Sequence, residues 1–73
     1  MPTETRQEVA DVVRAELARR RIGQREVAQA LEMSQPAVSR RLAGEVAFDV
    51  DDLAKLAGLL EMDPRDLLPA ATT

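Results

Sequence analysis

Apolar side chains recur at intervals of three and four residues along most of the chain, and this spacing places them on one face of an α-helix. Val9, Val13 and Leu17 follow this pattern first, and it returns in each later segment of the sequence. Start and stop signals divide the pattern into five parts. The sequence predicts helices over residues 5–20, 24–31 and 35–43, a fourth that follows Asp49 and a fifth that starts at Pro64.

Residues with short polar side chains mark the starts of the predicted helices. Thr5 and Glu8 have the spacing of a capping box, in which two side chains satisfy each other's free backbone N–H groups. Ser34, Asp49 and Asp63 stand where the third, fourth and fifth helices need an N-cap.

Glycine and proline mark the predicted helix ends. Gly23 can adopt the left-handed backbone that closes the first helix, Gly44 ends the third, and Pro69 stops the fifth. Short connections force consecutive helices to pack against one another, apart from a longer loop at residues 44–48. The predicted fold is an all-α, compact five-helix orthogonal bundle.

The composition agrees with one small helical domain. Of the 73 residues, Phe48 is the only aromatic residue, and Ala, Val and Leu supply most of the apolar content. We expect a single domain over residues 1–73, with a core of about residues 6–68 and a tail at 70–73. No apolar run approaches the roughly 20 residues that span a bilayer, and the polar N-terminus does not resemble a secretory signal. The expected location is cytoplasmic.

The residue types exclude several kinds of chemistry. The chain contains neither Cys nor His, which rules out disulfides, thiolate chemistry and the common zinc sites. Asp49, Asp51 and Asp52 are interpreted as groups that cap a helix and stabilise its dipole; a carboxylate cluster for a metal or for acid–base chemistry is the alternative. We expect no enzyme activity, no cofactor and no small-molecule ligand.

Charge is distributed unevenly along the chain, whose net charge is −3. Residues 14–41 contain seven arginines against three glutamates, a net charge of +4, whereas residues 45–73 contain two basic and seven acidic residues, a net charge of −5. A nucleic-acid surface requires local positive potential and not a positive total. Arg19, Arg20 and Arg21 either contact phosphate or form an ordinary solvated helix end.

The segment QREVAQALEMSQPAVSRRLAG, at residues 24–44, contains two short amphipathic stretches separated by a brief turn. It resembles the Cro and phage-repressor type of helix-turn-helix, called the XRE family. Residues 48–68 are similar to the fourth and fifth helices of that family, so the resemblance covers about residues 6–68. It implies a lambda-repressor-like DNA-binding domain, with the helix-turn-helix as helices two and three.

Two positions in the segment depart from the family pattern. Glu32 stands where the family usually has Gly in the turn. Either Glu32 adopts a left-handed backbone, at a cost of roughly 1–2 kcal/mol, or the turn has a different shape. Arg41 stands where the family often has an apolar residue, and we expect Leu42 to take over its packing.

The third predicted helix has an inner and an outer side. With Val38 at the centre of the inner side, a rotation of 100° per residue leaves several residues pointing outward. An α-helix fits the major groove of DNA, where each base pair shows a distinct pattern of donors and acceptors. The resemblance and this geometry together predict base contacts from Gln35, Pro36, Ser39 and Arg40.

Phosphate contacts are predicted for Gln24, Arg25 and Arg41, of which Gln24 matches a phosphate-contacting position of the family. Each prediction has a plainer alternative. Arg25 can pair locally with Glu26 or Gln29, and Arg41 can pack with its stem in the core. The residues predicted to contact bases can likewise be ordinary solvated surface.

These observations predict a sequence-specific regulator of transcription that binds double-stranded DNA. One recognition helix covers about half a site, and the resemblance implies a two-fold dimer on an operator with an inverted repeat. We expect a weak homodimer that forms on DNA through Leu67, Leu68 and Ala70.

Two other functions fit the same fold. One is a protein-interaction module of the antitoxin or anti-regulator type, and the other is a phage recombination-directionality factor. The arginines gathered at the helix-turn-helix segment favour DNA over a protein partner.

Overall fold

The computed structural model describes residues 2–68 and the side chains of residues 5–68. All regular secondary structure in this range is helical, with no strand among the residues described, which confirms the all-α class. Four α-helices and one 3₁₀ turn follow in order. They are α1 (Pro2–Arg20), α2 (Gln24–Leu31), α3 (Gln35–Leu42), α4 (Val50–Leu60) and η1 (Pro64–Leu67).

The prediction of five α-helices is correct for four of them, because the predicted fifth helix is a 3₁₀ turn of four residues. Pro64 fixes the start of this turn. Leu68 has an extended backbone, with φ −92° and ψ 151°, as expected for a residue that precedes a proline. The segment between the two prolines is therefore too short to complete an α-helix.

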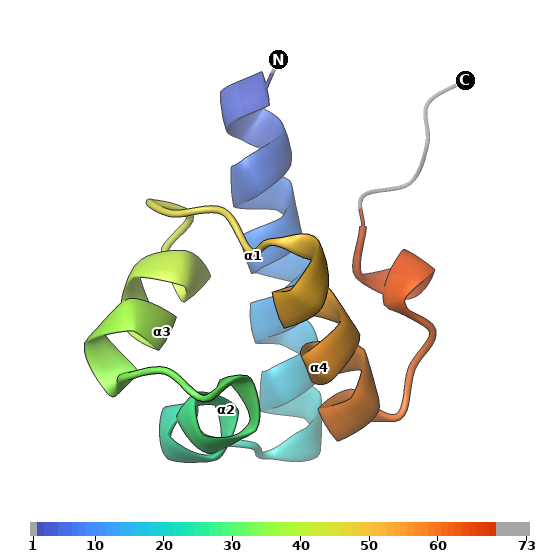
Figure 1. The fold of residues 1–73 in the computed structure, drawn as a ribbon. Coiled ribbons are helices and arrows are strands. Elements are labelled where there is room, and N and C mark those ends of the chain that lie inside the picture. Colours follow the sequence, from blue (N-terminus) through green and yellow to red (C-terminus); the bar gives the residue numbers. More distant parts are fainter. Residues whose placement is uncertain (1, 69–73) are drawn as a thin grey trace.

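α1 forms the centre of the molecule (Figure 1). α3 lies on one side of it, α4 and η1 lie on the other, and α2 lies at the lower end of the view. α2 packs against both α3 and α4, while α1 packs against α3, α4 and η1. Within the described residues, no Cα of α3 lies within 8 Å of a Cα of α4.

The core lies where these helices meet, and every predicted helical face contributes to it. Val13, Val27, Val38, Leu56 and Leu67 are fully buried. Val9, Leu17, Ala28, Leu31, Leu42 and Phe48 are buried in the same cluster. The periodicity of the sequence thus identified the packing face of each helix.

Three of the four predicted N-caps are present. The Ser34 hydroxyl accepts a hydrogen bond from the Ala37 N–H at 3.2 Å. The Asp49 and Asp52 side chains form a capping box, with N–H to oxygen distances of 2.7 and 3.1 Å. Asp63 caps η1 by accepting from the Arg65 N–H at 2.9 Å.

The predicted start of the first helix is wrong. α1 begins at Pro2, three residues before Thr5, so Thr5 and Glu8 lie inside the helix and form no capping box. Proline is well suited to the first helical position, because its fixed φ is helical and its missing N–H would have no partner inside the helix.

The helices end in a shared arrangement. Arg21, Glu32 and Glu61 each have a left-handed backbone, with φ of 58°, 57° and 56°, directly after α1, α2 and α4. The N–H of the following residue then returns to a carbonyl five residues earlier, as in the bond from Ile22 to Leu17 at 2.9 Å. This is the Schellman motif, which satisfies carbonyls that the helix end leaves free.

Apolar packing explains why three residues with side chains tolerate this backbone. The residues that follow them, Ile22, Met33 and Met62, pack against the core, and such a contact commonly accompanies the motif. Of the two possibilities given for Glu32, a left-handed backbone or a turn of different shape, the structure has the left-handed backbone. The prediction for Gly23 is wrong, because Gly23 has an extended backbone, with φ −90° and ψ 172°, and is the N-cap of α2.

Candidate nucleic-acid interface

α3 presents two sides with different surroundings. Val38 and Leu42 are buried. Leu42 thus provides the apolar contact that the family often makes with the residue at position 41, as expected. The four residues predicted to contact bases are all exposed on the remaining surface of the helix: Gln35, Pro36, Ser39 and Arg40. Their exposure makes them available to a ligand, and base contact itself stays a prediction.

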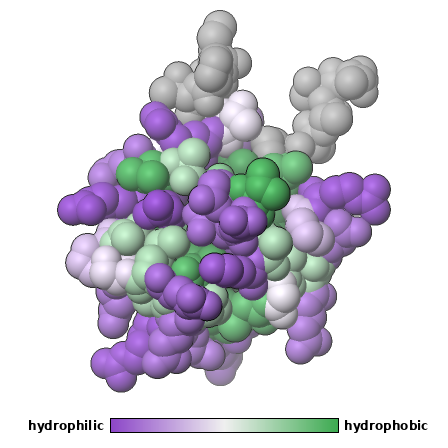
Figure 2. All heavy atoms as spheres, viewed as in Figure 1, coloured by the Kyte–Doolittle hydropathy of each residue, from purple (hydrophilic) through white to green (hydrophobic). Residues whose placement is uncertain are grey.

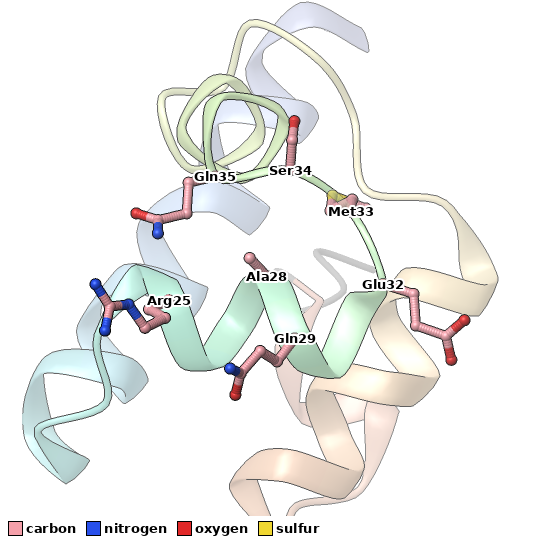
Figure 3. Close-up of a pocket in the computed structure, with 7 residues that line it drawn as sticks. All are labelled: Arg25, Ala28, Gln29, Glu32, Met33, Ser34 and Gln35. Atoms are coloured by element: carbon pink, nitrogen blue, oxygen red, sulfur yellow. The ribbon is translucent and has the colours of Figure 1, made fainter.

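A recess lies between α2 and the start of α3, and Figure 3 shows the seven residues that line it. Ala28 forms its floor, where a larger side chain would push the two helices apart. Arg25 from α2 and Gln35 from α3 extend to the same side of the recess, while Glu32 at the other end of α2 points away from them (Figure 3). Two residues predicted to act on different parts of DNA thus lie side by side.

Gln29 also lines this recess, and sequence reasoning did not assign it a role at the site. It follows Arg25 by four residues, the spacing that places two side chains on the same face of a helix. Neither Glu26 nor Gln29 forms a hydrogen bond or an ion pair with Arg25 within the described residues. The local pairing considered for Arg25 is therefore absent.

Ion pairs leave most of the unpaired positive charge near the two helices of the motif. Arg14 pairs with Asp11, and Arg19 and Arg20 share the Glu16 carboxylate, Arg19 at 2.9 Å. Within residues 5–68, no carboxylate lies within 4.0 Å of the guanidinium groups of Arg21, Arg25 and Arg40. Of the three consecutive arginines, Arg21 has no carboxylate within 4.0 Å among residues 5–68, and the single charge of Glu16 neutralises only one of the other two.

The start of α2 is open toward solvent. Gln24 is the exposed first residue of the helix, and its N-cap, Gly23, has no side chain that could cap the first turn. Backbone N–H groups at a helix N-terminus favour an anion, because they lack partners inside the helix and lie at the positive end of its dipole. This geometry suits the phosphate contact predicted for Gln24.

Arg41 is placed differently from the other arginines of the motif. Its Nε lies 3.4 Å from Oδ2 of Asp52, which is buried, and its Nη1 donates to the Ala37 carbonyl at 3.2 Å. The Nε–H does not point at the carboxylate and makes no hydrogen bond. The arrangement fits the alternative in which Arg41 packs with its stem against the core.

The predicted dimer surface is reduced by the fold. Leu67 is fully buried, so its side chain cannot face a second copy, and this part of the prediction is wrong. η1 packs against α1 and α4, and Leu67 is its buried residue. Leu68 is 47% exposed and stays available, while Ala70 lies outside the described residues.

The acidic side chains of the described residues form no group of three that could hold a metal ion. Asp49 and Asp52 cap α4, as expected of them. None of the helices described is both long enough and apolar enough to cross a membrane.

Comparison with known families gives one match. A sequence model described as helix-turn-helix, of the Cro and phage-repressor type, matches residues 13–67. Neither a curated protein nor a solved structure matches the chain. The matched range includes α2, α3 and α4 completely, together with η1 and residues 13–20 of α1.

Proposed function

The chain belongs to the Cro and phage-repressor type of helix-turn-helix proteins, the XRE family, and from this premise we propose that it is a sequence-specific regulator of transcription. The family supplies DNA-binding domains, typically without enzyme activity. One observation supports the proposal most directly. Arg25 and Arg40, on the exposed surface of α2 and α3, carry charges that no carboxylate among residues 5–68 neutralises.

In this proposal α3 enters the major groove with its exposed side toward the bases. The planar guanidinium of Arg40 suits the two acceptors of guanine, and the Gln35 amide can pair with adenine at two points. Ser39 can contact a base or a phosphate. Pro36 has no N–H to donate and would offer only van der Waals contact, for example to a thymine methyl group.

Gln24 and Arg25 would hold the DNA backbone. Gln24 opens α2 with free N–H groups, and Arg25 extends beside Gln35 in the recess (Figure 3). Such contacts fix the position of the protein on the duplex but carry no sequence information. A phosphate contact from Arg41 would require the Arg41–Asp52 pair to open.

A single α3 covers about half an operator, so we propose that two copies bind an inverted repeat. Of the residues predicted at the dimer surface and described by the structure, Leu68 is the one with an exposed side chain. We propose that the dimer is weak because so little apolar area is available. We further propose that residues 1–73 act as one domain, in the cytoplasm, where the DNA is accessible.

The first test is binding to DNA, measured by fluorescence anisotropy with labelled duplexes across a series of salt concentrations. We expect binding whose logarithmic affinity falls linearly with the logarithm of salt, with a slope of about 0.9 for each phosphate neutralised. Selection of bound sequences from a random library should return a motif with two-fold symmetry. No binding at micromolar protein and low salt would overturn the proposal in favour of a protein-interaction module.

A further inference from the structure

The recognition helix α3 and helix α4 do not touch through their backbones. No Cα of α3 lies within 8 Å of a Cα of α4 among the described residues, and both helices pack against α1 and α2 instead (Figure 1). A side-chain ion pair, Arg41 of α3 with Asp52 of α4, bridges the space between them. Packing on α1 and α2 sets the general placement of α3 and α4, and this ion pair joins the two helices directly.

The Asp52 carboxylate is held in place by bonds that do not involve Arg41. Asp52 is buried, its Oδ2 accepts the Asp49 N–H at 3.1 Å, and its own N–H donates to the Asp49 side chain at 2.7 Å. These bonds fix the carboxylate in the first turn of α4. Arg41, with 23% of its side chain exposed, is anchored in turn by its bond to the Ala37 carbonyl.

Joining two helices through an ion pair with a buried carboxylate has a cost in desolvation free energy. Removing charges from water costs free energy that the mutual attraction only partly returns, and apolar residues of similar size often stabilise a fold as well or better. Stability alone therefore does not explain a charged pair here. Fixing one orientation of the elements that carry the charges is a better-attested use of such pairs.

We propose that Asp52 is a positioning residue for DNA reading: through Arg41 it fixes the rotation of α3 about its axis and so aims Arg40 and Gln35 at the bases. This inference rests on the proposed function. Arg40 is the chain neighbour of Arg41, so the side of α3 that Arg41 holds inward sets the side that Arg40 presents. Arg14 of α1 also holds this end of α3, because its guanidinium donates to the carbonyl of Leu42, the residue after Arg41.

The same geometry argues against a phosphate contact by Arg41. If Arg41 turned outward, Asp52 would keep its negative charge in a buried position without a cationic partner, and an uncompensated buried charge is strongly destabilising. Arg41 and Asp52 should therefore stay paired when DNA binds. Their effect on binding should appear in sequence preference and not in the number of phosphates contacted.

The experiment compares Asp52→Asn and Arg41→Met with the unaltered protein. Asparagine keeps an acceptor for the Asp49 N–H, and methionine keeps an apolar stem. Arg41→Met also leaves the buried Asp52 carboxylate without its cation and should lower the free energy of unfolding. Asp51→Asn is the matched control, because Asp51 is exposed in the same turn of α4 and loses the same charge. Circular dichroism and urea unfolding would establish that each variant is folded at the binding temperature.

Two measurements are made on each protein. The ratio of affinities for the selected operator and a scrambled duplex should fall about tenfold in Asp52→Asn and in Arg41→Met, and should not change in Asp51→Asn. The salt slope should match that of the unaltered protein in all three. In the free protein, amide hydrogen exchange should become faster in α3 for the two pair variants only.

Each other outcome has a definite meaning. A loss of affinity that is equal for both duplexes, with the salt slope lower by about 0.9 in Arg41→Met alone, would make Arg41 a phosphate contact and overturn the proposal. Unchanged exchange in α3 would overturn it even if the unaltered protein failed to bind DNA. That failure would itself count against the proposed function, so the two hypotheses are tested separately.

Discussion

α3 and α4 are both short and amphipathic, yet they use their polar residues in opposite ways. In α4 the Asp52 carboxylate is used inside the fold, because it accepts the Asp49 N–H and forms an ion pair with Arg41. In α3 the outward side chains of Gln35, Ser39 and Arg40 have no hydrogen bond or ion pair among the described residues. Polar groups that the fold does not need are the better indicators of a binding surface.

The charged residues of the two halves of the sequence differ in the same way. The net charge of −3 hides a basic half and an acidic half. Figure 2 shows hydrophilic residues around apolar ones on the visible face. Many of the acidic residues serve helix starts, whereas Arg25 and Arg40 serve no such purpose. We expect substitutions in α4 to change stability first, and substitutions on the outer side of α3 to change binding first.

The largest effect should come from the buried face of α4. Leu56 is fully buried, so Leu56→Ala leaves a cavity and should lower the free energy of unfolding by about 2–5 kcal/mol. Urea unfolding followed by circular dichroism measures it. Val50→Ala is the control on the same helix, because Val50 is 81% exposed and its truncation should cost less than about 0.5 kcal/mol. Equal losses for the two variants would contradict the assigned faces of α4.

Arg40→Ala should show the opposite pattern. We expect the free energy of unfolding to change by less than about 0.5 kcal/mol. Binding should weaken by about 1–3 kcal/mol and lose its preference at one base pair. Arg25→Ala should instead weaken binding to all duplexes alike and lower the salt slope. If the two variants exchanged these behaviours, the outward face of α3 would have to be rotated from the one described.

Smaller effects are expected where the helices end. Glu32→Gly removes the strain of a left-handed residue but adds flexibility to the unfolded chain, so it should stabilise the protein by about 0.5–1 kcal/mol. Gly44→Ala should do the reverse, at a cost of roughly 1–2 kcal/mol, because Gly44 has φ +80°. Thermal unfolding of both variants provides the measurement, and a destabilised Glu32→Gly would show that its side chain has a role we have not identified.

The smallest effect concerns pH. The Arg65 side chain, followed by the Arg65 backbone N–H, lowers the pKa of Asp63 below its ordinary value of 3.8. A lowered folded-state pKa adds stability that is present above the ordinary pKa and is lost as the pH falls through the lower one. Asp63→Asn should therefore flatten the decline in melting temperature below about pH 4. The change should be slight because both groups are exposed, and an equally steep decline in the variant would count against this pair.

Local signals in the sequence predicted what local physics decides. Ser34, Asp49 and Asp63 were identified as caps because a short polar side chain can reach a free N–H nearby, and the inward positions of Val38 and Leu42 follow from helical periodicity. Gly23 misled the prediction because glycine permits a left-handed backbone but does not require it. Arg21 adopts that backbone instead, since the next residue, Ile22, packs against the core.

Contacts between distant segments could not be predicted in the same way. Nothing in the sequence near Arg41 identifies Asp52 as its partner, because the two residues belong to helices whose relative placement depends on the whole core. The inward position of Leu67 and the place of Gln29 in the recess have the same origin. The site was therefore predicted where it lies on one helix and missed where two helices build it.

Both ends of the described chain lie away from α2. The first turn of α1 lies at the upper end in Figure 1 and η1 lies at the right-hand side, whereas α2 lies at the lower end. A reporter or a second binding domain joined there would leave the reading surface uncovered. Two copies connected through these ends by a flexible linker could therefore grip one duplex together, and the second contact would benefit from a high effective concentration.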